Sequence, residues 1–155
     1  MRTHLYERVW LIFAGVMLVV FLGAIAVSAF GLGMRPPGHT ERIAPARISQ
    51  DPRFAQPSIK EMTPGHYEAY LVARIWSFTP GDIRIPRGSR VSFHVASPDV
   101  THGFEIVGTD ANAMVIPGYI THLEHRFDRP GEYLILCNEY CGAGHQFMQA
   151  RIIVE

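Results

Sequence analysis

The longest uncharged stretch in the sequence constrains this chain more than any other feature. The stretch Val9–Met34 contains 26 consecutive residues without a charge, and its first 22 residues are mostly apolar. A helix rises ~1.5 Å per residue, so about 22 residues span ~33 Å and can cross a hydrocarbon core of ~30 Å. We therefore predict a transmembrane helix over residues 9–34, embedded in a lipid bilayer, behind an N-terminal tail over residues 1–8.

The flanks of this stretch carry residue types that favour a membrane–water interface, namely Arg8, Trp10 and Arg35. A secretory signal peptide is the alternative, because small residues lie near the end of the stretch: Ala26, Ser28 and Ala29. The apolar region of a signal peptide is normally only ~7–15 residues long, so we favour a retained span. No cysteine lies near its end, and a lipid-anchored lipoprotein is therefore not indicated.

Charge and composition exclude two broad classes of protein. The 14 Lys and Arg residues balance 14 Asp and Glu residues and form no basic block. Because binding to nucleic acid needs concentrated positive charge, we expect no nucleic-acid partner. Apolar residues make up 48% of the chain, which is enough to bury a core, so general disorder is excluded. The length of 155 residues allows one compact domain beside the helix.

Proline content separates two regions after the predicted span. Residues 35–68 contain six prolines and few apolar runs, so we predict a linker and approach segment. From residue 69 to 155, short β-like runs alternate with turn signals such as the Pro-Gly pairs at 117–118 and 130–131. This pattern predicts an antiparallel sandwich with Greek-key connections, built from seven strands: 69–76, 82–86, 91–96, 104–107, 120–127, 133–136 and 149–154.

Both cysteines lie in one short stretch that carries soft metal-ligand donors. Cys137, Cys141, His145 and Met148 have the spacing Cys-x3-Cys-x3-His-x2-Met and directly follow a predicted strand. Two thiolates, an imidazole and a thioether suit copper much better than hard cations. The motif therefore predicts a copper site at the end of that strand.

A further ligand is expected from a distant strand end. His102 lies between two predicted strands, on a loop at one end of the sandwich. Gly142 and Gly144 let the backbone of the motif curl so that its side chains can converge on one point. Asp99, three residues before His102, is a candidate to orient the imidazole through a hydrogen bond, and a solvated loop aspartate is the alternative.

Three alternative roles for the motif account for its residues less well. A disulfide between Cys137 and Cys141 would leave the spacing of His145 and Met148 unexplained. A closed zinc site could use the two thiols and two histidines, but methionine is a poor zinc ligand. A blue-copper centre uses two histidines, one cysteine and a weak axial methionine, so this chain has one cysteine more than it needs. Two thiolates four residues apart can bridge two coppers, each of which then takes one histidine.

The motif resembles a known family. The run Cys-x-Glu-x-Cys-Gly-x-Gly-His-x-x-Met, with the upstream Ser-Pro-Asp-Val-x-His-Gly-Phe, is similar to the dinuclear CuA domain of cytochrome c oxidase subunit 2. The likeness covers residues 69–155, and the single preceding span resembles the single-span B-type haem–copper oxidases. The resemblance implies one N-terminal transmembrane helix, an all-β cupredoxin-like Greek-key sandwich and dinuclear copper as the cofactor.

The resemblance also implies a role for each ligand position. In this role, Cys137 and Cys141 are the bridging thiolates. His102 and His145 bind one copper each. Met148 is a weak ligand, and Glu139 contributes its backbone carbonyl. In many family members the side chain of that glutamate also reaches a magnesium at the interface with subunit 1, an option that Glu139 retains. Trp76 resembles the aromatic residues near the point where electrons arrive, and packing beneath the sandwich is its alternative role.

The function implied by the resemblance is that of the electron-receiving subunit of a terminal respiratory oxidase. Such a subunit takes electrons from a soluble c-type cytochrome or a small copper protein and passes them to haem in subunit 1, where oxygen is reduced. The complex is a proton-translocating oxidoreductase, and this chain is not catalytic alone. The alternatives are a CuA subunit of another reductase, such as nitric oxide reductase, and a membrane-tethered copper-binding module.

Orientation follows from the resemblance rather than from charge. Two arginines precede the span and three follow it closely, which weakly favours a cytoplasmic C-terminus. Because the donor works outside, the resemblance implies a single-pass protein of the cell membrane with its C-terminal domain on the periplasmic or outer side.

Residues 35–155 carry 12 basic and 13 acidic side chains. We therefore expect an apolar docking patch that includes Met114 and Val115, with weak salt dependence.

Overall fold

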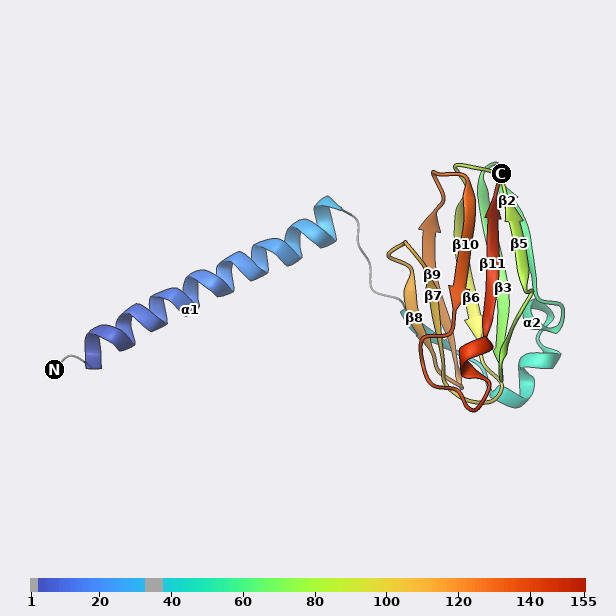
Figure 1. Ribbon diagram of the computed structural model, residues 1–155, viewed down its shortest axis with the longest axis horizontal. Helices are drawn as coiled ribbons and strands as arrows, with labels where there is room; N and C mark the ends of the chain where they lie inside the picture. Colours follow the sequence, from blue (N-terminus) through green and yellow to red (C-terminus); the bar gives the residue numbers. More distant parts are fainter. Residues whose placement is uncertain (1–2, 33–37) are drawn as a thin grey trace. The chain divides into compact units, whose positions relative to one another are not determined.

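A computed structural model describes residues 3–32 and 38–155 of the chain (Figure 1). The chain divides into two compact units, an N-terminal helical unit and a C-terminal β unit that contains most of the residues. Residues 1–2 of the predicted tail, 33–34 of the predicted span and 35–37 of the predicted linker lie outside the described residues.

The N-terminal unit is one long apolar helix. The α-helix α1 (Thr3–Ala26) continues directly into the π-helical turn η1 (Val27–Gly31). An 18-residue window within its segment His4–Gly31 has a mean hydropathy of 2.7, and none of that window is buried. The helix begins before the predicted start at residue 9, because the residues just before that position, such as Glu7 and Arg8, also favour helix. Within the described residues, this is the one helix long and apolar enough to cross a membrane.

The C-terminal unit is a sandwich of two β-sheets, which confirms the predicted fold class. One sheet has the strand order β1 (Gly38–Arg42), β9 (Tyr119–Arg126), β6 (Arg90–Ala96), β3 (His66–Arg74) and β2 (Ser58–Thr63), with β4 (Ser77–Thr79) also paired to β3. The other sheet has the order β5 (Asp82–Ile85), β11 (Gln149–Val154), β10 (Gly131–Leu136), β7 (His102–Ile106) and β8 (Asn112–Val115).

Two strand pairs are parallel, whereas the sequence pattern predicted antiparallel pairing. The chain leaves β3 for β4, crosses to β5 in the other sheet, and returns as β6 beside β3 in the same direction. The second parallel pair is β5 with β11. All seven predicted strands are present. The additional strands β1, β2, β4 and β8 are short or largely exposed, so their sequences lack a clear apolar alternation.

The described part of the predicted linker belongs to the β unit. Strand β1 pairs with β9, and β2 pairs with β3. Between them, the 3-10 helix η2 (Pro45–Gln50) and the short helix α2 (Pro52–Ala55) each begin with a proline, which suits the first turn of a helix. This segment packs Ile43, Ile48 and Phe54 on the outer face of the six-stranded sheet. Two of the prolines in this segment, Pro45 and Pro52, therefore start helical turns rather than mark a free linker.

The main core lies between the two sheets and extends into the motif. Phe93 packs against Phe104 and against Phe127, with ring centroids 5.5 Å and 6.4 Å apart. The same buried cluster includes the three sulfur-bearing residues of the motif, Cys137, Cys141 and Met148. The loop that carries the motif is therefore anchored by its own sulfur atoms in the core of the sandwich.

Candidate metal centre

The motif occupies the connection from β10 to β11, at the end of the sandwich opposite the C-terminus (Figure 1). At the neck of this loop, the backbone N–H of Cys137 donates to the carbonyl oxygen of Met148 at 3.2 Å. Further along, the N–H of His145 donates to the carbonyl of Gly142 at 3.0 Å, and the 3-10 helix η3 (His145–Phe147) follows. These backbone bonds turn the chain back on itself, so residues 137 and 148 meet.

The loop brings its four soft donor atoms together around Cys141. The Sγ atom of Cys141 lies 3.7 Å from Cys137 Sγ, 3.7 Å from His145 Nδ1 and 3.7 Å from Met148 Sδ. Both cysteines and Met148 are buried, while His145 is half-buried. The two cysteines are free thiols, and their separation is far beyond the ~2.05 Å of an S–S bond.

The other strand end supplies an imidazole, as the sequence predicted. His102 Nδ1 lies 4.0 Å from Cys137 Sγ, and the carbonyl oxygen of Glu139 lies 3.1 Å from the same sulfur. His102 is the first residue of β7 rather than a loop residue, and its side chain is fully buried. The ligand atoms of His102, Cys137 and Cys141 all lie within 4.8 Å of one another.

Asp99 fixes the orientation of the His102 ring. Its Oδ1 atom lies 2.8 Å from His102 Nε2, and its Oδ2 atom accepts a 2.7 Å hydrogen bond from the backbone N–H of Ile75. Burial raises the pKa of Asp99, but the hydrogen bonds from His102, Ile75, Val100 and Ser97 outweigh it, so the pKa is lowered overall. An ionised carboxylate at Nε2 keeps the proton on that nitrogen. The Nδ1 lone pair of His102 is then free for a metal.

The thiol of Cys141 is protonated at neutral pH in the absence of a metal. Burial, followed by the hydrogen bond and the charge of Cys137, raises the pKa of the Cys141 thiol to about 11. Backbone N–H groups of Trp76 and of Cys141 itself act in the opposite direction. Binding of a metal therefore has to displace a proton from this thiol.

Trp76 lies over the motif rather than beneath the sandwich. It occupies the second position of the two-residue turn between β3 and β4, with a φ of +65°, a backbone conformation that bulky residues rarely adopt. Its side chain is 49% exposed, so the alternative of a buried packing residue is wrong. A Cβ atom added at Gly144 would overlap the indole ring, which shows how closely Trp76 approaches the loop.

The donor set fits copper. Two thiols, two imidazoles and a thioether are soft or borderline ligands, and they converge without any carboxylate in the cluster. The separation of the two thiol sulfurs is less than twice a typical metal–thiolate bond of about 2.3 Å. Both sulfurs can therefore reach the same metal ion.

Comparisons with known proteins identify the family. Residues 76–155 match the sequence model for the periplasmic domain of cytochrome c oxidase subunit II. The chain is also 39% identical over 154 residues to cytochrome c oxidase subunit 2 of Thermus thermophilus, covering 97% of this chain and 92% of that protein. The chain belongs to the cytochrome c oxidase subunit 2 family. As a member, it is a subunit of an oxidoreductase complex in respiratory electron transport, and its apolar helix anchors it in a membrane.

Solved structures support membership of the cytochrome c oxidase subunit 2 family. A chain from the cryo-EM structure of a haem–copper terminal oxidase dimer has a TM-score of 0.83 and 34% sequence identity. That match covers 96% of this chain and 99% of the other. The periplasmic domain of subunit II of cytochrome oxidase from Bradyrhizobium japonicum has a TM-score of 0.53 at 18% identity, and covers 57% of this chain and 83% of that one. This second match supports the cupredoxin-like fold alone.

Several residues around the site in this family member were not found by sequence reasoning. The side-chain amide of Asn138 donates to Glu105 Oε2 and to Asn112 Oδ1, both at 3.1 Å, and so ties the start of the loop to β7 and β8. A Cβ atom at Gly103 would lie 2.7 Å from the backbone nitrogen of Asn138. The glycine directly after His102 was the available signal, because glycine permits such a close backbone approach.

Of the two predicted docking residues, Met114 is exposed but Val115 is buried.

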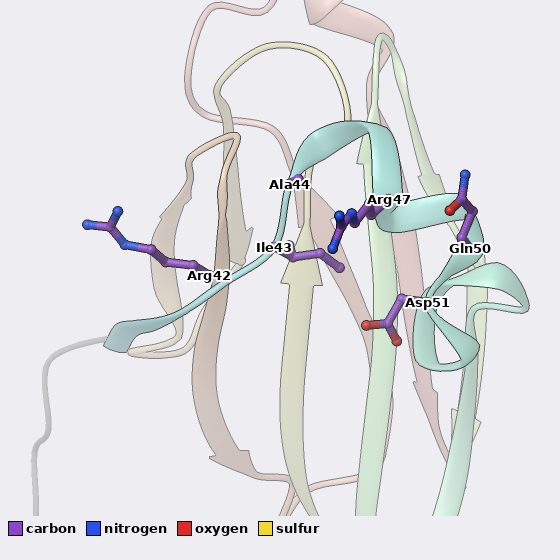
Figure 2. Close-up of a pocket in the computed structure, with 6 residues that line it drawn as sticks. All are labelled: Arg42, Ile43, Ala44, Arg47, Gln50 and Asp51. Carbon is purple, nitrogen blue, oxygen red and sulfur yellow. The ribbon is translucent and has the colours of Figure 1, made fainter.

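One surface hollow of the β unit is lined by residues other than the candidate copper ligands. It has a volume of about 540 Å³ and opens beside β1 and η2 (Figure 2). Its lining consists of Arg42, Ile43, Ala44, Arg47, Gln50 and Asp51. None of the candidate copper ligands of this cytochrome c oxidase subunit 2 relative lines this hollow.

Proposed function

We propose that the chain receives electrons one at a time at a dinuclear CuA centre and passes them to haem in subunit 1, where oxygen is reduced. The observation that carries this proposal is the convergence of two thiol sulfurs, 3.7 Å apart, with an imidazole nitrogen beside each. The proposed bridging ligands are Cys137 and Cys141. His102 and His145 serve one copper each.

The number of donor atoms favours two metal ions over one. Besides the thiols and imidazoles, the thioether of Met148 lies beside Cys141 and the carbonyl of Glu139 lies beside Cys137. These six donors exceed the needs of a blue-copper centre, which takes two histidines, one cysteine and a weak axial methionine. Each thiol has its own imidazole and its own weak donor, and this pairing matches two metals that share both sulfurs.

The chain's own residues provide a fixed and shielded environment. When bound, a pair of coppers supplies one-electron redox chemistry that needs neither a substrate pocket nor an acid–base pair. Asp99 holds the ring of His102 in place. The backbone bond from Cys137 to Met148 closes the neck of the loop. Burial of both thiols in the core keeps water away from them and limits rearrangement of the ligands.

The exposed aromatic side chains around the loop favour docking of a soluble c-type cytochrome or a small copper protein at this end of the domain. Tyr140 and Phe147 are 74% and 75% exposed, and Trp76 and Met114 are about half-exposed. An exposed apolar group of this kind is typical of a protein contact surface. Because the domain is nearly neutral, association should depend on this apolar contact more than on charge steering.

The remaining contacts of the subunit follow from the same proposal. The exposed side chain of Glu139 offers a carboxylate to a magnesium ion at the contact with subunit 1. The helix of residues 4–31 spans the cell membrane once, and the domain lies on the periplasmic or outer side, where a soluble donor can reach it. The family model's own description as a periplasmic domain supports this side.

Electron paramagnetic resonance on the copper-loaded full chain in detergent tests the proposed centre. We expect two coppers per chain and a signal in which one unpaired electron is shared by both. One copper with a mononuclear signal would overturn the proposal.

The alternative is that the same centre serves another reductase, such as nitric oxide reductase. The identity of the large subunit that co-purifies with the chain distinguishes an oxidase from such a reductase.

A further inference from the structure

The two-residue turn Ile75–Trp76, between β3 and β4, contacts both of the chain segments that carry the proposed ligands. On one side, the backbone N–H of Ile75 donates to Asp99, whose other oxygen holds His102. On the other side, Trp76 lies against the loop that carries Cys141 and His145. One turn from the six-stranded sheet thus contacts both ends of the ligand cluster.

The contact on the Cys141 side is made by the indole of Trp76. A Cβ atom at Gly144 would overlap the ring, and one at Gly142 would lie 3.4 Å from its Nε1 atom. Gly142 has a φ of +122°, which by itself calls for glycine. Gly144 has a φ of −97° and a ψ of 9°, a region that residues other than glycine also adopt. The indole, rather than the backbone conformation, is therefore what requires glycine at position 144.

We propose that Trp76 is a positioning residue, whose indole holds the backbone of residues 142–144 so that Cys141 and His145 stay aligned with Cys137 and His102. This inference rests on the proposed copper site and adds a determinant outside the ligand motif. The φ of +65° at Trp76 is consistent with such a role, because unfavourable backbone conformations persist where surrounding contacts hold them. Glycine would adopt that φ more readily, so the turn itself does not call for a tryptophan at this position.

A double-mutant cycle between Trp76 and Gly144 tests this inference in the full chain in detergent. Trp76→Gly removes the ring while easing the backbone, and Gly144→Ala inserts a methyl group into the space that the ring occupies. We expect each single variant to speed the loss of copper to a chelator by about 10-fold or more and to alter the copper resonance spectrum. Gly144→Ala should add little in the Trp76→Gly background, because the overlapping ring is gone.

Two further variants separate positioning from general effects on folding. Trp76→Phe keeps an aromatic ring over Gly144 and should restore a spectrum close to that of the unmodified chain. Phe147→Ala removes an aromatic side chain of the same loop that is 75% exposed, and should leave both the spectrum and the copper loss unchanged. If Gly144→Ala is harmless alone, or equally harmful with and without the indole, the inference is wrong.

A metal-free measurement separates this inference from the proposed copper centre. In the reduced apo chain, the rate at which iodoacetamide alkylates Cys141 reports how well the loop is held closed. Trp76→Gly should raise this rate by about 10-fold or more, since reactivity follows exposure of the thiol, while Phe147→Ala should not. An unchanged rate in Trp76→Gly overturns the positioning role. A raised rate together with a mononuclear copper signal in the unmodified chain would instead overturn the dinuclear centre alone.

Discussion

Two histidine pairs in this domain occupy very different settings. At the end of the sandwich, His102 and His145 direct their Nδ1 atoms at two neighbouring sulfurs. On the six-stranded sheet, His94 of β6 and His122 of β9 stand directly opposite each other across the strands. Their Nδ1 atoms are only 2.9 Å apart, closer than any two donors in the proposed copper site. Proximity of histidines alone therefore does not distinguish the two.

The direction of the nitrogen lone pairs distinguishes them. In the sheet pair, one Nδ1–H points at the other Nδ1, so the two rings share a hydrogen bond rather than a common metal position. The ring of His94 stacks on Tyr70, and its buried Nε2 atom has no hydrogen-bond partner among residues 3–32 and 38–155. A proton is therefore disfavoured at Nε2 and belongs on Nδ1, where it is donated to His122. The copper-site histidine His102 has the opposite arrangement, with its Nε2 bonded to Asp99 and its Nδ1 free.

The largest expected effect is loss of the proposed centre by removing one sulfur. Cys141→Ser should reduce copper from two ions per chain to at most one and abolish the shared-electron signal, because Cys141 contacts three other donors. Copper analysis and electron paramagnetic resonance measure this. His122→Ala is the matched control from the sheet pair and should retain both ions. Loss of a copper in that control would show that the comparison of the two pairs is mistaken.

An intermediate effect is expected when the support of His102 is weakened. Asp99→Asn cannot accept hydrogen bonds from both His102 and Ile75 through its two side-chain atoms, since one of them becomes a donor. We expect about 10- to 100-fold faster loss of copper to a chelator. Asp110→Asn is a matched control, because Asp110 bonds His125 at 2.9 Å on the surface. Equal rates in the two variants would argue against a special role for Asp99.

The smallest expected effect concerns pH and the sheet pair. Burial, and then the charge of His122, lowers the pKa of His94, while Glu68 and Glu41 raise it and Arg53 lowers it. The folded state therefore favours neutral His94. Its contribution to stability is complete above the ordinary pKa of 6.5 and declines as pH falls below that value.

Thermal unfolding of the metal-free chain measures this effect. The Tm should fall between pH 7.5 and pH 5.0, and the fall should be smaller by a few degrees in His94→Phe, which keeps a ring against Tyr70. An identical fall in the variant and the unmodified chain would mean that His94 does not contribute.

Short-range features of the fold and of the site were predictable from the sequence. Cys137, Cys141, His145 and Met148 lie within one loop, so local spacing was enough to predict that they converge. The β sandwich was predictable because strands such as β6 alternate strictly between apolar and polar residues. The place of His102 could be inferred only through the resemblance and the strand pattern, and its full burial in β7 was not foreseen.

Long-range contacts and weakly patterned strands were not predictable. The approach of Trp76 to Gly144 joins residues far apart in sequence through a turn whose φ is unusual, and nothing in the local sequence signals it. Strand β2 is mostly exposed at a sheet edge and therefore lacks an apolar alternation. The prolines of residues 45–55 predict part of a linker, because they obscure the apolar face formed by Ile48 and Phe54.

The burial of the motif's sulfur atoms in the main core has a consequence for assembly. Cys137, Cys141 and Met148 belong to the same apolar cluster as the phenylalanines between the sheets. A metal that binds only this folded arrangement shifts the unfolding equilibrium by mass action, by about 2.7 kcal/mol when its free concentration is 100 times its dissociation constant. Maturation of the centre and resistance of the whole domain to proteolysis are therefore linked, and a cell short of copper would degrade this subunit faster.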